Sequence, residues 1–489
     1  MDAILRPLAE WACSLEAAAV PGRTATRAGW QWASVLGAIH SVADHPAAHA
    51  VGTVARRTGG GGPATLLPEG DSASAEAAVW ANTARSMLLD YDDYLFAGHT
   101  GHSAVLVSLA LGELVGAAGA DLLAATVVAN EAGGRLGAAM LLGPHNGQMW
   151  AYIHNIGAAL AGSRLLGLDE RAAAAAMGLA LTQPPYPLPA TFMGSDGKAL
   201  TASGPSVEGM RAALLAAEGV ECDVDVLSDR SGFFARFHPQ ALTGMFSGYG
   251  TAWVTDSLSY KIYPGCAYLD TAVDAARALL TRIAEERGRQ LDAAEVVAGR
   301  IEAGMLTTGM EQMSGWYRGP GATLREINMT FSSAYSVALL LLAGRLTAAE
   351  LHPAWWRPRA DAIDDLAGRI EVTFDAAMNA GMQAPEPSGF DLREVLGRDR
   401  ADPLLDGVSF VDYQSRFPAT VELRLADGSV WRETCDVPLG GAGRPDDETR
   451  RLVREKLEGN GGPPGLFERL ERLADHPGAR TLLTSRAAR

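Results

Sequence analysis

Residues 89–103 read LDYDDYLFAGHTGHS, and they gather three carboxylates and two imidazoles into one short polar run. These groups are Asp90, Asp92, Asp93, His99 and His102. An apolar segment of helical length follows at once, so the histidines fall at a helix start, where the helix dipole favours an anion. A carboxylate beside a histidine orients the ring and raises its basicity. The run therefore predicts a general base held over a carboxylate-binding helix end.

Ser103 is expected to cap the following helix, since a serine hydroxyl satisfies a free amide at a helix start. Two other interpretations of residues 89–103 stay open. The run is also typical of a polar loop that leads into a capped helix. His99, His102 and one aspartate would also suit a metal ion. No other cluster in the sequence has the spacing of metal ligands, so no metal is expected.

A second polar run, PHNGQMWAYIHN at 144–155, carries His145 and His154 among aromatic and amide side chains. A lone histidine in an apolar helix is more often a hydrogen-bonded core residue than a functional one. Two histidines beside Asn146 and Asn155 favour the wall of a pocket instead.

Lysine is rare in this chain, because only three of its 41 basic residues are lysine. Lysine is a compact charge whose pKa shifts on burial, whereas arginine is a planar fork that stays charged. Lys198 stands in the small polar loop GSDGKALTASGPS at 194–206, and Lys261 stands beside aromatic residues in YKIYPGC at 260–266. Both lysines are expected to hold a carboxylate. Lys456 lies in a charged run and is interpreted as part of a solvated helix face.

The chain has 489 residues, 48% of them hydrophobic, and a net charge of −16. This length is typical of two domains, and the composition is that of a globular protein. The acidic balance disfavours nucleic acid or an anionic membrane as a partner, because phosphate binding needs a basic field. Four cysteines without a CxxC pair favour a reduced, cytoplasmic protein. Residues 136–163 lack Asp, Glu, Lys and Arg, but polar side chains interrupt them, so buried helices are expected there rather than a membrane span.

The first 255 residues predict helices that pack closely, because segments of helical length are rich in Ala, Leu, Val and Gly. The predicted helices include 104–119, 121–142, 156–167, 170–182 and 207–219, and residues 1–21 are expected to contain an amphipathic helix. The glycine-rich run 57–63 is interpreted as a flexible connection, since it lacks the spacing of a phosphate loop.

The character of the sequence changes near residue 257. The predicted strands are 294–303, 369–376, 419–425 and 430–435, with a hairpin turn at 426–429 between the last two. A helix is predicted over 329–343, and strands interleaved with helices favour a smaller α+β unit. From residue 446 the chain is charged and helical again. The expected fold class is therefore mainly α with an α+β part.

Several segments in order along the chain resemble the MmgE/PrpD family, which includes 2-methylcitrate dehydratase and cis-aconitate decarboxylase. They are AAVWAN at 77–82 running into 89–93, IGAALAGSRLLGLD at 156–169, GKAL at 197–200, GMRAALLAAEG at 209–219, KIYPGC at 261–266 and FSSAYSVA at 331–338. The resemblance implies a helical domain at 1–256, an inserted α+β lid at 257–442 and a segment at 443–489 that returns to the helical domain. It also implies a homodimer that needs no metal or organic cofactor.

The resemblance assigns roles to five positions. Asp90 and Asp92 match the two aspartates of the family, and His102 matches its active-site histidine by spacing. Lys198 and Lys261 match its two pocket lysines.

This chain also departs from the family pattern. The second pocket histidine of the family falls near Gln148, and the histidine three residues after the first lysine is Thr201. A histidine that decarboxylase members carry five residues after the second lysine is Cys266. His145 or His154 is a candidate substitute, and the changed acid–base groups favour a substrate other than 2-methylcitrate or cis-aconitate.

The expected function is that of a cofactor-independent lyase, a dehydratase that removes a proton next to a carboxylate of a small polycarboxylic acid. His102, oriented by Asp90 or Asp92, is expected to move that proton, and His154 or Tyr263 to act as the second proton-transfer group. The remaining predicted substrate contacts are Asp93, His99, Ser103, Gln148, Thr201, Tyr263 and Cys266. An epimerase, isomerase or decarboxylase on a related dicarboxylate is the alternative. A metal-dependent hydrolase and an inactive binding protein are the candidates from other classes.

Overall fold

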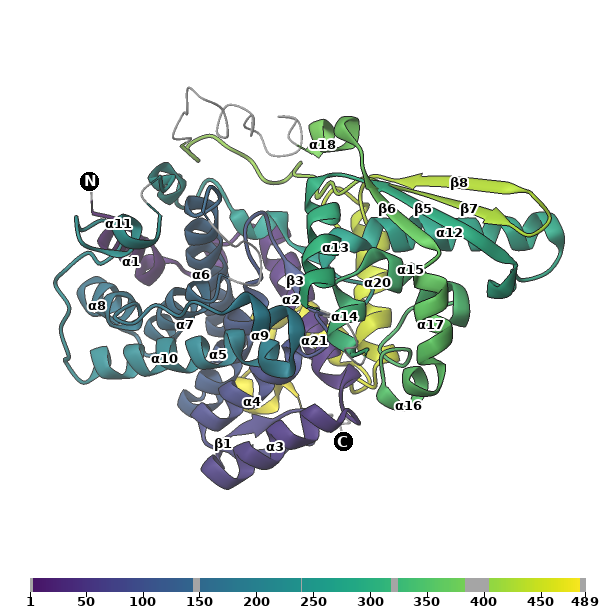
Figure 1. Cartoon of the computed structure of the whole chain (residues 1–489). Coiled ribbons are helices and arrows are strands. Elements are labelled where there is room, and N and C mark those ends of the chain that lie inside the picture. The colour runs from purple at the N-terminus through teal and green to yellow at the C-terminus, as the bar shows by residue number, and fades with distance from the viewer. Residues whose placement is uncertain (1–2, 144–149, 239, 318–323, 383–403, 484–489) are drawn as a thin grey trace.

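The computed structural model describes residues 3–143, 150–238, 240–317, 324–382 and 404–483. A larger helical lobe and a smaller lobe built around a four-stranded sheet lie side by side (Figure 1). The predicted fold class, mainly α with an α+β part, is confirmed. The predicted division of the chain at residues 256 and 442 stays a prediction.

The helical lobe contains the apolar helices that the sequence predicts. Its main elements are α1 (Leu5–Ser14), α2 (Gly22–Ser41), α3 (Pro46–Gly59), α4 (Ala75–Met87), α5 (Gly101–Val115), α6 (Gly119–Ala139), α7 (Tyr152–Leu165), α8 (Glu170–Ala180), α9 (Pro189–Gly194), α10 (Leu200–Ala217) and α11 (Phe233–Phe237). Small residues allow close packing of these helices. At Gly209 of α10, a Cβ atom would lie only 2.4 Å from the carbonyl oxygen of Asn155 in α7.

Two short antiparallel pairs also belong to this lobe. Strand β1 (Gly60–Leu66) pairs with β2 (Asp71–Ala73), and β3 (Asp93–Tyr94) pairs with β4 (Ser259–Tyr260). The glycine-rich run 57–63 is therefore not a flexible connection, and that prediction was wrong. It forms the end of α3 and the start of β1, because its backbone finds hydrogen-bond partners on β2.

The smaller lobe has a sheet with strand order β6-β5-β7-β8. Its elements are α12 (Asp270–Arg287), β5 (Val296–Ala303), α13 (Met305–Tyr317), α14 (Glu326–Thr330), α15 (Ser333–Ala343), α16 (Pro353–Trp356), α17 (Ala360–Ala367), β6 (Ile370–Phe374), α18 (Ala376–Met382), β7 (Ala419–Leu425) and β8 (Val430–Cys435). Strand β5 runs parallel to β6 and antiparallel to β7, and β7 and β8 form the predicted hairpin. Helix α12 covers one face of the sheet (Figure 1).

All four predicted strands are present. The predicted helix at 329–343 is interrupted, since α14 ends at Thr330 and α15 begins at Ser333. The side chain of Ser332 accepts a hydrogen bond from the amide of Tyr335 and so caps a new helix start.

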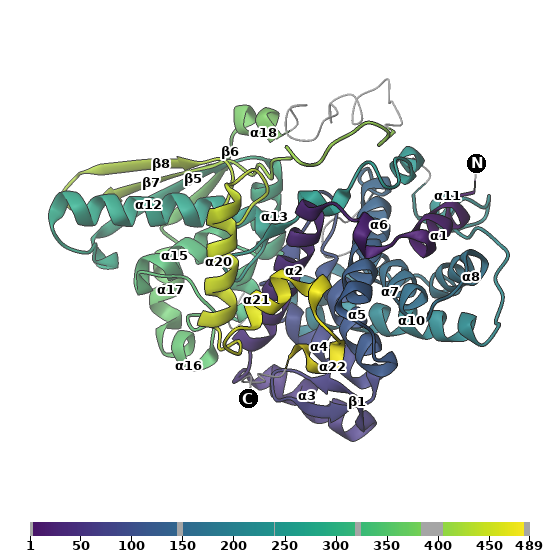
Figure 2. The same ribbon diagram turned by 180° about the vertical axis from the view of Figure 1, so that it is seen from behind.

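The last described helices are α20 (Asp446–Gly459), which lies at the junction of the lobes, and α21 (Leu466–Glu471) and α22 (Ala479–Leu482), which pack against the helical lobe (Figure 2). Helix α20 runs beside α2 (Figure 2). An ion pair of 2.7 Å between Arg27 of α2 and Asp446 joins the two. Lys456 of α20 faces this junction and is only 4% exposed, so its interpretation as part of a solvated helix face was wrong.

Helix α1 confirms the amphipathic helix predicted near the start of the chain, with Leu5, Leu8, Ala9 and Ala12 buried. Within the described residues, none of the helices combines the length and apolar character that crossing a membrane requires.

Candidate active site

The centre of the candidate site is the segment that joins α4 to β3. Asp90 adopts a φ of 54°, a left-handed conformation that aspartate tolerates better than most residues. Strand β3 then pairs Asp93 with Tyr260 of β4, so Lys261 follows directly. The amide of Lys261 donates to the carbonyl of Asp92 at 3.2 Å. Two segments far apart in sequence are thus fixed side by side.

Lys261 is fully buried and has a partner for each of its three ammonium protons. Its Nζ lies 2.6 Å from Oδ1 of Asp92, 2.9 Å from Oδ1 of Asp90 and 3.0 Å from the carbonyl oxygen of Asp90. Burial alone lowers the pKa of Lys261, but the carboxylates of Asp90 and Asp92 outweigh it and raise the pKa above its usual value. Lys261 is therefore a permanent charge that holds both aspartates.

Lys198 reaches the same carboxylate from the turn at 196–199 that precedes α10. Its Nζ donates to Oδ1 of Asp90 at 3.2 Å and to the carbonyl of Met87 at 2.9 Å. In the described part of the chain its third proton has no hydrogen-bond acceptor, and the rings of Phe192 and Phe331 lie 5.6 and 5.8 Å from Nζ. Burial lowers the pKa of Lys198, although Asp90 opposes the shift. This lysine has a donor left for a ligand.

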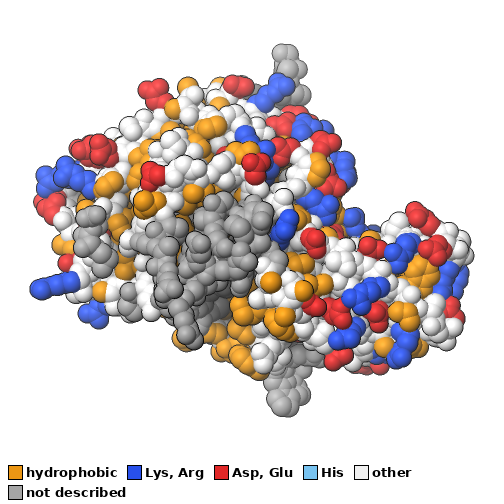
Figure 3. Space-filling view, turned by 90° about the horizontal axis from the view of Figure 1, so that it is seen from above, with side chains coloured by type: hydrophobic (Ala, Val, Ile, Leu, Met, Phe, Trp, Pro, Cys, Tyr) orange, Lys and Arg blue, Asp and Glu red, His pale blue; other side chains and the backbone are white. Residues whose placement is uncertain are grey.

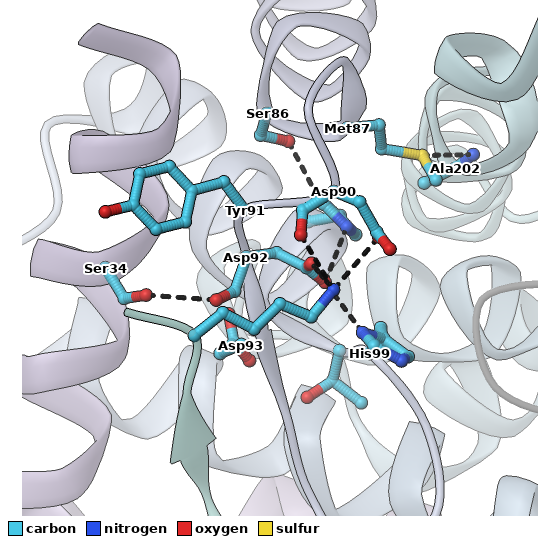
Figure 4. A network of polar contacts seen from close by, with 12 residues as sticks. Ser34, Ser86, Met87, Asp90, Tyr91, Asp92, Asp93, His99 and Ala202 are labelled. Carbon is cyan, nitrogen blue, oxygen red and sulfur yellow. Dashed lines mark hydrogen bonds and ion pairs between the residues drawn. The ribbon is translucent and has the colours of Figure 1, made fainter. Parts of the chain in front are cut away.

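Asp92 links the lysines to the histidines. Its Oδ2 accepts a hydrogen bond of 2.8 Å from Nδ1 of His99, whose ring keeps slight solvent access. Burial raises the pKa of Asp92, but Lys261 and then the two nearby histidines outweigh burial and hold the pKa well below its usual range. Figure 4 shows Asp90, Asp92 and His99 in one network, with Ser34 reaching the segment from the other side. Asp92 is therefore a buried anion.

His102 lies in the first turn of α5 and is fully buried. Its Nδ1 lies 2.7 Å from Oγ of Ser86, and that hydroxyl donates its proton to the carbonyl of Thr83 at 2.8 Å. Because the single hydroxyl proton of Ser86 is donated to Thr83, we assign the ring proton of His102 to Nδ1, which donates to Ser86. Nε2 then carries the lone pair. It lies 3.0 Å from Oδ2 of Asp92, and this contact raises the pKa of His102 against the effect of burial.

Burial also decides the charge of the two histidines at the centre. It lowers the pKa of His102, while Asp92 acts in the opposite direction. His154 of α7 lies beside His102 with ring centroids 5.8 Å apart, and burial holds its pKa well below the usual value. Nε2 of His154 is buried and meets no hydrogen-bond partner among the described residues. Both rings are neutral near pH 7.

Ser103 does not cap α5, and the prediction that it does so was wrong. The helix begins at Gly101, and Thr100 precedes it. Oγ of Ser103 lies 3.0 Å from Nδ1 of His154 and donates to the carbonyl of Thr100 at 3.2 Å. Ser103 therefore orients His154 in the way that Ser86 orients His102.

The Asp93 carboxylate points away from this cluster. Its Oδ2 accepts a hydrogen bond of 2.7 Å from Gln31 of α2. Gly101 gives the carboxylate room, because a Cβ atom at this position would lie 1.9 Å from Oδ1 of Asp93. Burial, and next the charge of Asp92, raises the pKa of Asp93 to about 7.

The remaining predicted residues have surroundings of different kinds. The Tyr263 hydroxyl donates to Asp274 at 2.7 Å and so is already occupied. Cys266 lies in an apolar cluster with Phe192 and Phe331, and burial raises its thiol pKa to about 12. Thr201 is buried in the first turn of α10. Gln148 lies outside the described residues, as does His145.

Sequence reasoning missed three residues of this site. Ser86 orients His102 from α4, and no pattern in the sequence indicates that contact. Asp270, buried at the start of α12, has a pKa that burial raises well above its usual value, although the charge of Lys261 opposes this. Lys456 was noticed for its rarity but was placed on the surface. Its spacing from Leu452 and Val453, both buried in α20, was the available signal.

The described residues contain no group of three or more His, Cys, Asp or Glu side chains arranged to hold a metal ion. Lys198 and Lys261 also bring two ammonium groups to the Asp90 carboxylate, an environment that disfavours a divalent cation. On the face shown in Figure 3, basic and acidic side chains are interspersed over the smaller lobe, without a continuous basic surface.

Two protein-family models match the chain. The MmgE/PrpD N-terminal domain matches residues 6–243, and the MmgE/PrpD C-terminal domain matches residues 263–403. Among curated proteins, none matches the chain.

Proposed function

The chain belongs to the MmgE/PrpD family, and from this premise we propose that it is a cofactor-independent lyase of the dehydratase type. Family membership indicates dehydratase or lyase chemistry on an organic acid. The proposed substrate is a small polycarboxylic acid with a hydroxyl group. The proposed reaction removes a proton next to a carboxylate and expels the hydroxyl as water, which leaves an alkene.

The observation that carries this proposal is the pairing of His102 with Asp92. His102 is neutral, and its protonated Nδ1 leaves a lone pair on Nε2, as a general base requires. The buried Asp92 anion, 3.0 Å from that nitrogen, stabilises the imidazolium that forms when the ring takes a proton. A general base of this kind typically contributes about 10²–10⁴-fold in rate.

We assign different roles to Lys198 and Lys261. Lys198 has a donor to spare, so it binds the substrate carboxylate and stabilises the enolate-like charge that develops next to it. Its lowered pKa also suits it to give a proton to the departing hydroxyl. All three protons of Lys261 are bound to Asp90 and Asp92, so we assign it to holding the aspartates.

A second candidate reaction is epimerisation, and His154 favours it. Ser103 holds Nδ1 of His154, so this ring too offers Nε2 as a base, close to His102. Two neutral imidazoles suit a reaction that removes a proton from one face and returns one to the other. We also propose that the enzyme needs no metal or organic cofactor, that it forms a homodimer and that it is located in the cytoplasm.

The test is a product screen with hydroxylated and unsaturated di- and tricarboxylic acids, followed by proton NMR. Wild-type protein is compared with His102→Gln, which removes the base but keeps a polar side chain of similar size. A new alkene that appears only with the wild type supports the dehydratase, and an inverted centre supports the epimerase. Product formed equally by both proteins would rule out His102 as the base. An acid that binds in calorimetry without any turnover would support a binding protein instead.

A further inference from the structure

The third lysine of the chain also ends at the candidate site. Nζ of Lys456 donates to the carbonyl of Tyr91 at 2.6 Å, to Oγ of Ser34 at 2.8 Å and to the carbonyl of Lys261 at 3.0 Å. The carbonyl of Asp92 lies 3.4 Å away, and the Tyr91 ring centroid lies 4.0 Å from Nζ. One ammonium thus joins α20 to α2 and to both segments that carry the catalytic charges.

We propose that Lys456 is a positioning residue that fixes Asp92 and Lys261 relative to each other from behind the active site. The carbonyl of Tyr91 belongs to the peptide group that joins Tyr91 to Asp92, and the carbonyl of Lys261 belongs to the backbone of Lys261 itself. Holding both carbonyls therefore fixes the backbone positions from which the Asp92 carboxylate and the Lys261 ammonium meet. This inference rests on the proposed site, because it gives the C-terminal segment a role in that site.

Lys456 is buried, so its side-chain nitrogen needs hydrogen-bond partners inside the protein. A buried amine without partners is costly, and burial lowers the pKa of Lys456 to about 7 although the charges of Asp92 and Asp93 oppose the shift. Its acceptors are the hydroxyl of Ser34 and backbone carbonyls, which move only with the backbone. Arginine cannot substitute, since its planar fork does not converge on acceptors from three directions. Tyr91, Ile262 and Lys456 line a cavity of about 1090 Å³ on this side of the segment. Lys456 thus separates that cavity from the catalytic charges.

The small number of lysines makes a direct test possible. Protein labelled with ¹³C at lysine Cε gives three signals, which single substitutions assign to Lys198, Lys261 and Lys456. The deciding variant is Lys456→Met, which keeps the length of the side chain without the donors. We expect the Lys261 signal and the imidazole signals of His99 and His102 to shift in this variant, with its thermal unfolding still cooperative. Unchanged signals would overturn the proposal.

Two further variants separate positioning from general loss of stability. Leu457→Ala removes a buried neighbour on the same helix but no charge, and it is expected to lower stability while leaving the Lys261 and histidine signals in place. Ser34→Ala removes one acceptor, and it covers the case in which Lys456→Met does not fold. It should shift the Lys456 signal and, by a smaller amount, the Lys261 signal. Equal shifts in Leu457→Ala, or none in Ser34→Ala, would contradict the proposal.

The kinetic arm uses an acid that the product screen shows to be turned over. Lys456→Met should lower kcat by about 10²-fold, the scale of a misplacement near 1 Å, with a much smaller change in KM. A fall in kcat no larger than that in Leu457→Ala would contradict positioning. The spectroscopic arm needs no substrate, so the failure of the proposed reaction remains distinguishable from the failure of this inference.

Discussion

Nε2 of His102 lies 3.0 Å from Oδ2 of Asp92, the same oxygen that His99 contacts. The imidazole is neutral because it is buried, and the carboxylate is charged because Lys261 lies against it. A proton that reaches this nitrogen therefore arrives next to a fixed negative charge. The consequences for catalysis, pH dependence and stability are measurable.

Asp92→Asn should lower kcat by about 10²–10⁴-fold, because the imidazolium loses the anion that stabilises it. Asp92 raises the pKa of His102, so the variant base has a lower pKa. The acidic limb of the kcat/KM profile, where activity is lost as the base becomes protonated, should move to lower pH. A profile measured from pH 5 to pH 9 checks this, and an unmoved limb would argue against His102 as the base.

His102→Gln and His99→Gln form a matched pair, since both histidines face the same oxygen of Asp92. The tautomer assigned to His102 makes it the proton acceptor, so His102→Gln should lose about 10²–10⁴-fold in kcat. His99→Gln should cost far less in kcat, because glutamine still donates to Asp92. If the two losses were reversed in a turnover assay, His99 would be the base.

Asp93→Asn tests the buried carboxylate behind the site. The folded pKa of Asp93, about 7, lies above the ordinary value of 3.8. The protonated Asp93 carboxyl group contributes its whole share of the free energy of unfolding below pH 3.8, and this share is lost as the pH rises to the folded-state pKa of about 7. The variant should therefore gain stability relative to the wild type between pH 4 and pH 7 and level off above. Urea unfolding across this range measures the difference, and a constant offset would contradict the raised pKa.

Gly101→Ala should lower the free energy of unfolding by about 1–3 kcal/mol, because the new methyl group overlaps the Asp93 carboxylate and Val35. Gly204→Ala in α10 is the control. A Cβ atom there meets nothing within 4 Å, so alanine should be neutral or stabilising by up to about 1 kcal/mol in a helix. Thermal unfolding of both variants compares them, and equal melting temperatures would contradict the tight packing at Gly101.

The sequence predicts the elements of this fold well where local pattern decides them. Runs of small apolar residues give the buried helices, and the alternation at 419–425 and 430–435 gives the hairpin. Local pattern does not predict an element whose conformation depends on a contact with a residue far away in the sequence. The glycines at 57–63 become ordered because β2 pairs with this segment, and α5 begins at Gly101, which packs against the Asp93 carboxylate.

The candidate site follows the same rule. Asp92, His102, Lys198 and Lys261 are predictable from residue type and from the family resemblance, and the structure brings them together. Their orientation is not predictable, because it depends on partners from other elements, such as Ser86 and Gln31. Lys456 shows the limit most clearly. Its neighbours in sequence are charged, but the helical period places it on the buried face of α20.

The most direct test of the account is the incorporation of deuterium next to a carboxylate in D₂O. The panel of polycarboxylic acids is incubated with wild-type protein, His102→Gln and Gly204→Ala, and exchange is followed by proton NMR. The account predicts loss of one proton signal next to a carboxylate with the wild type and Gly204→Ala, and about 10²-fold slower loss or more with His102→Gln. Exchange at the same rate in all three proteins, or alkene formed by the wild type without a primary isotope effect or exchange at that carbon, would contradict proton removal by His102.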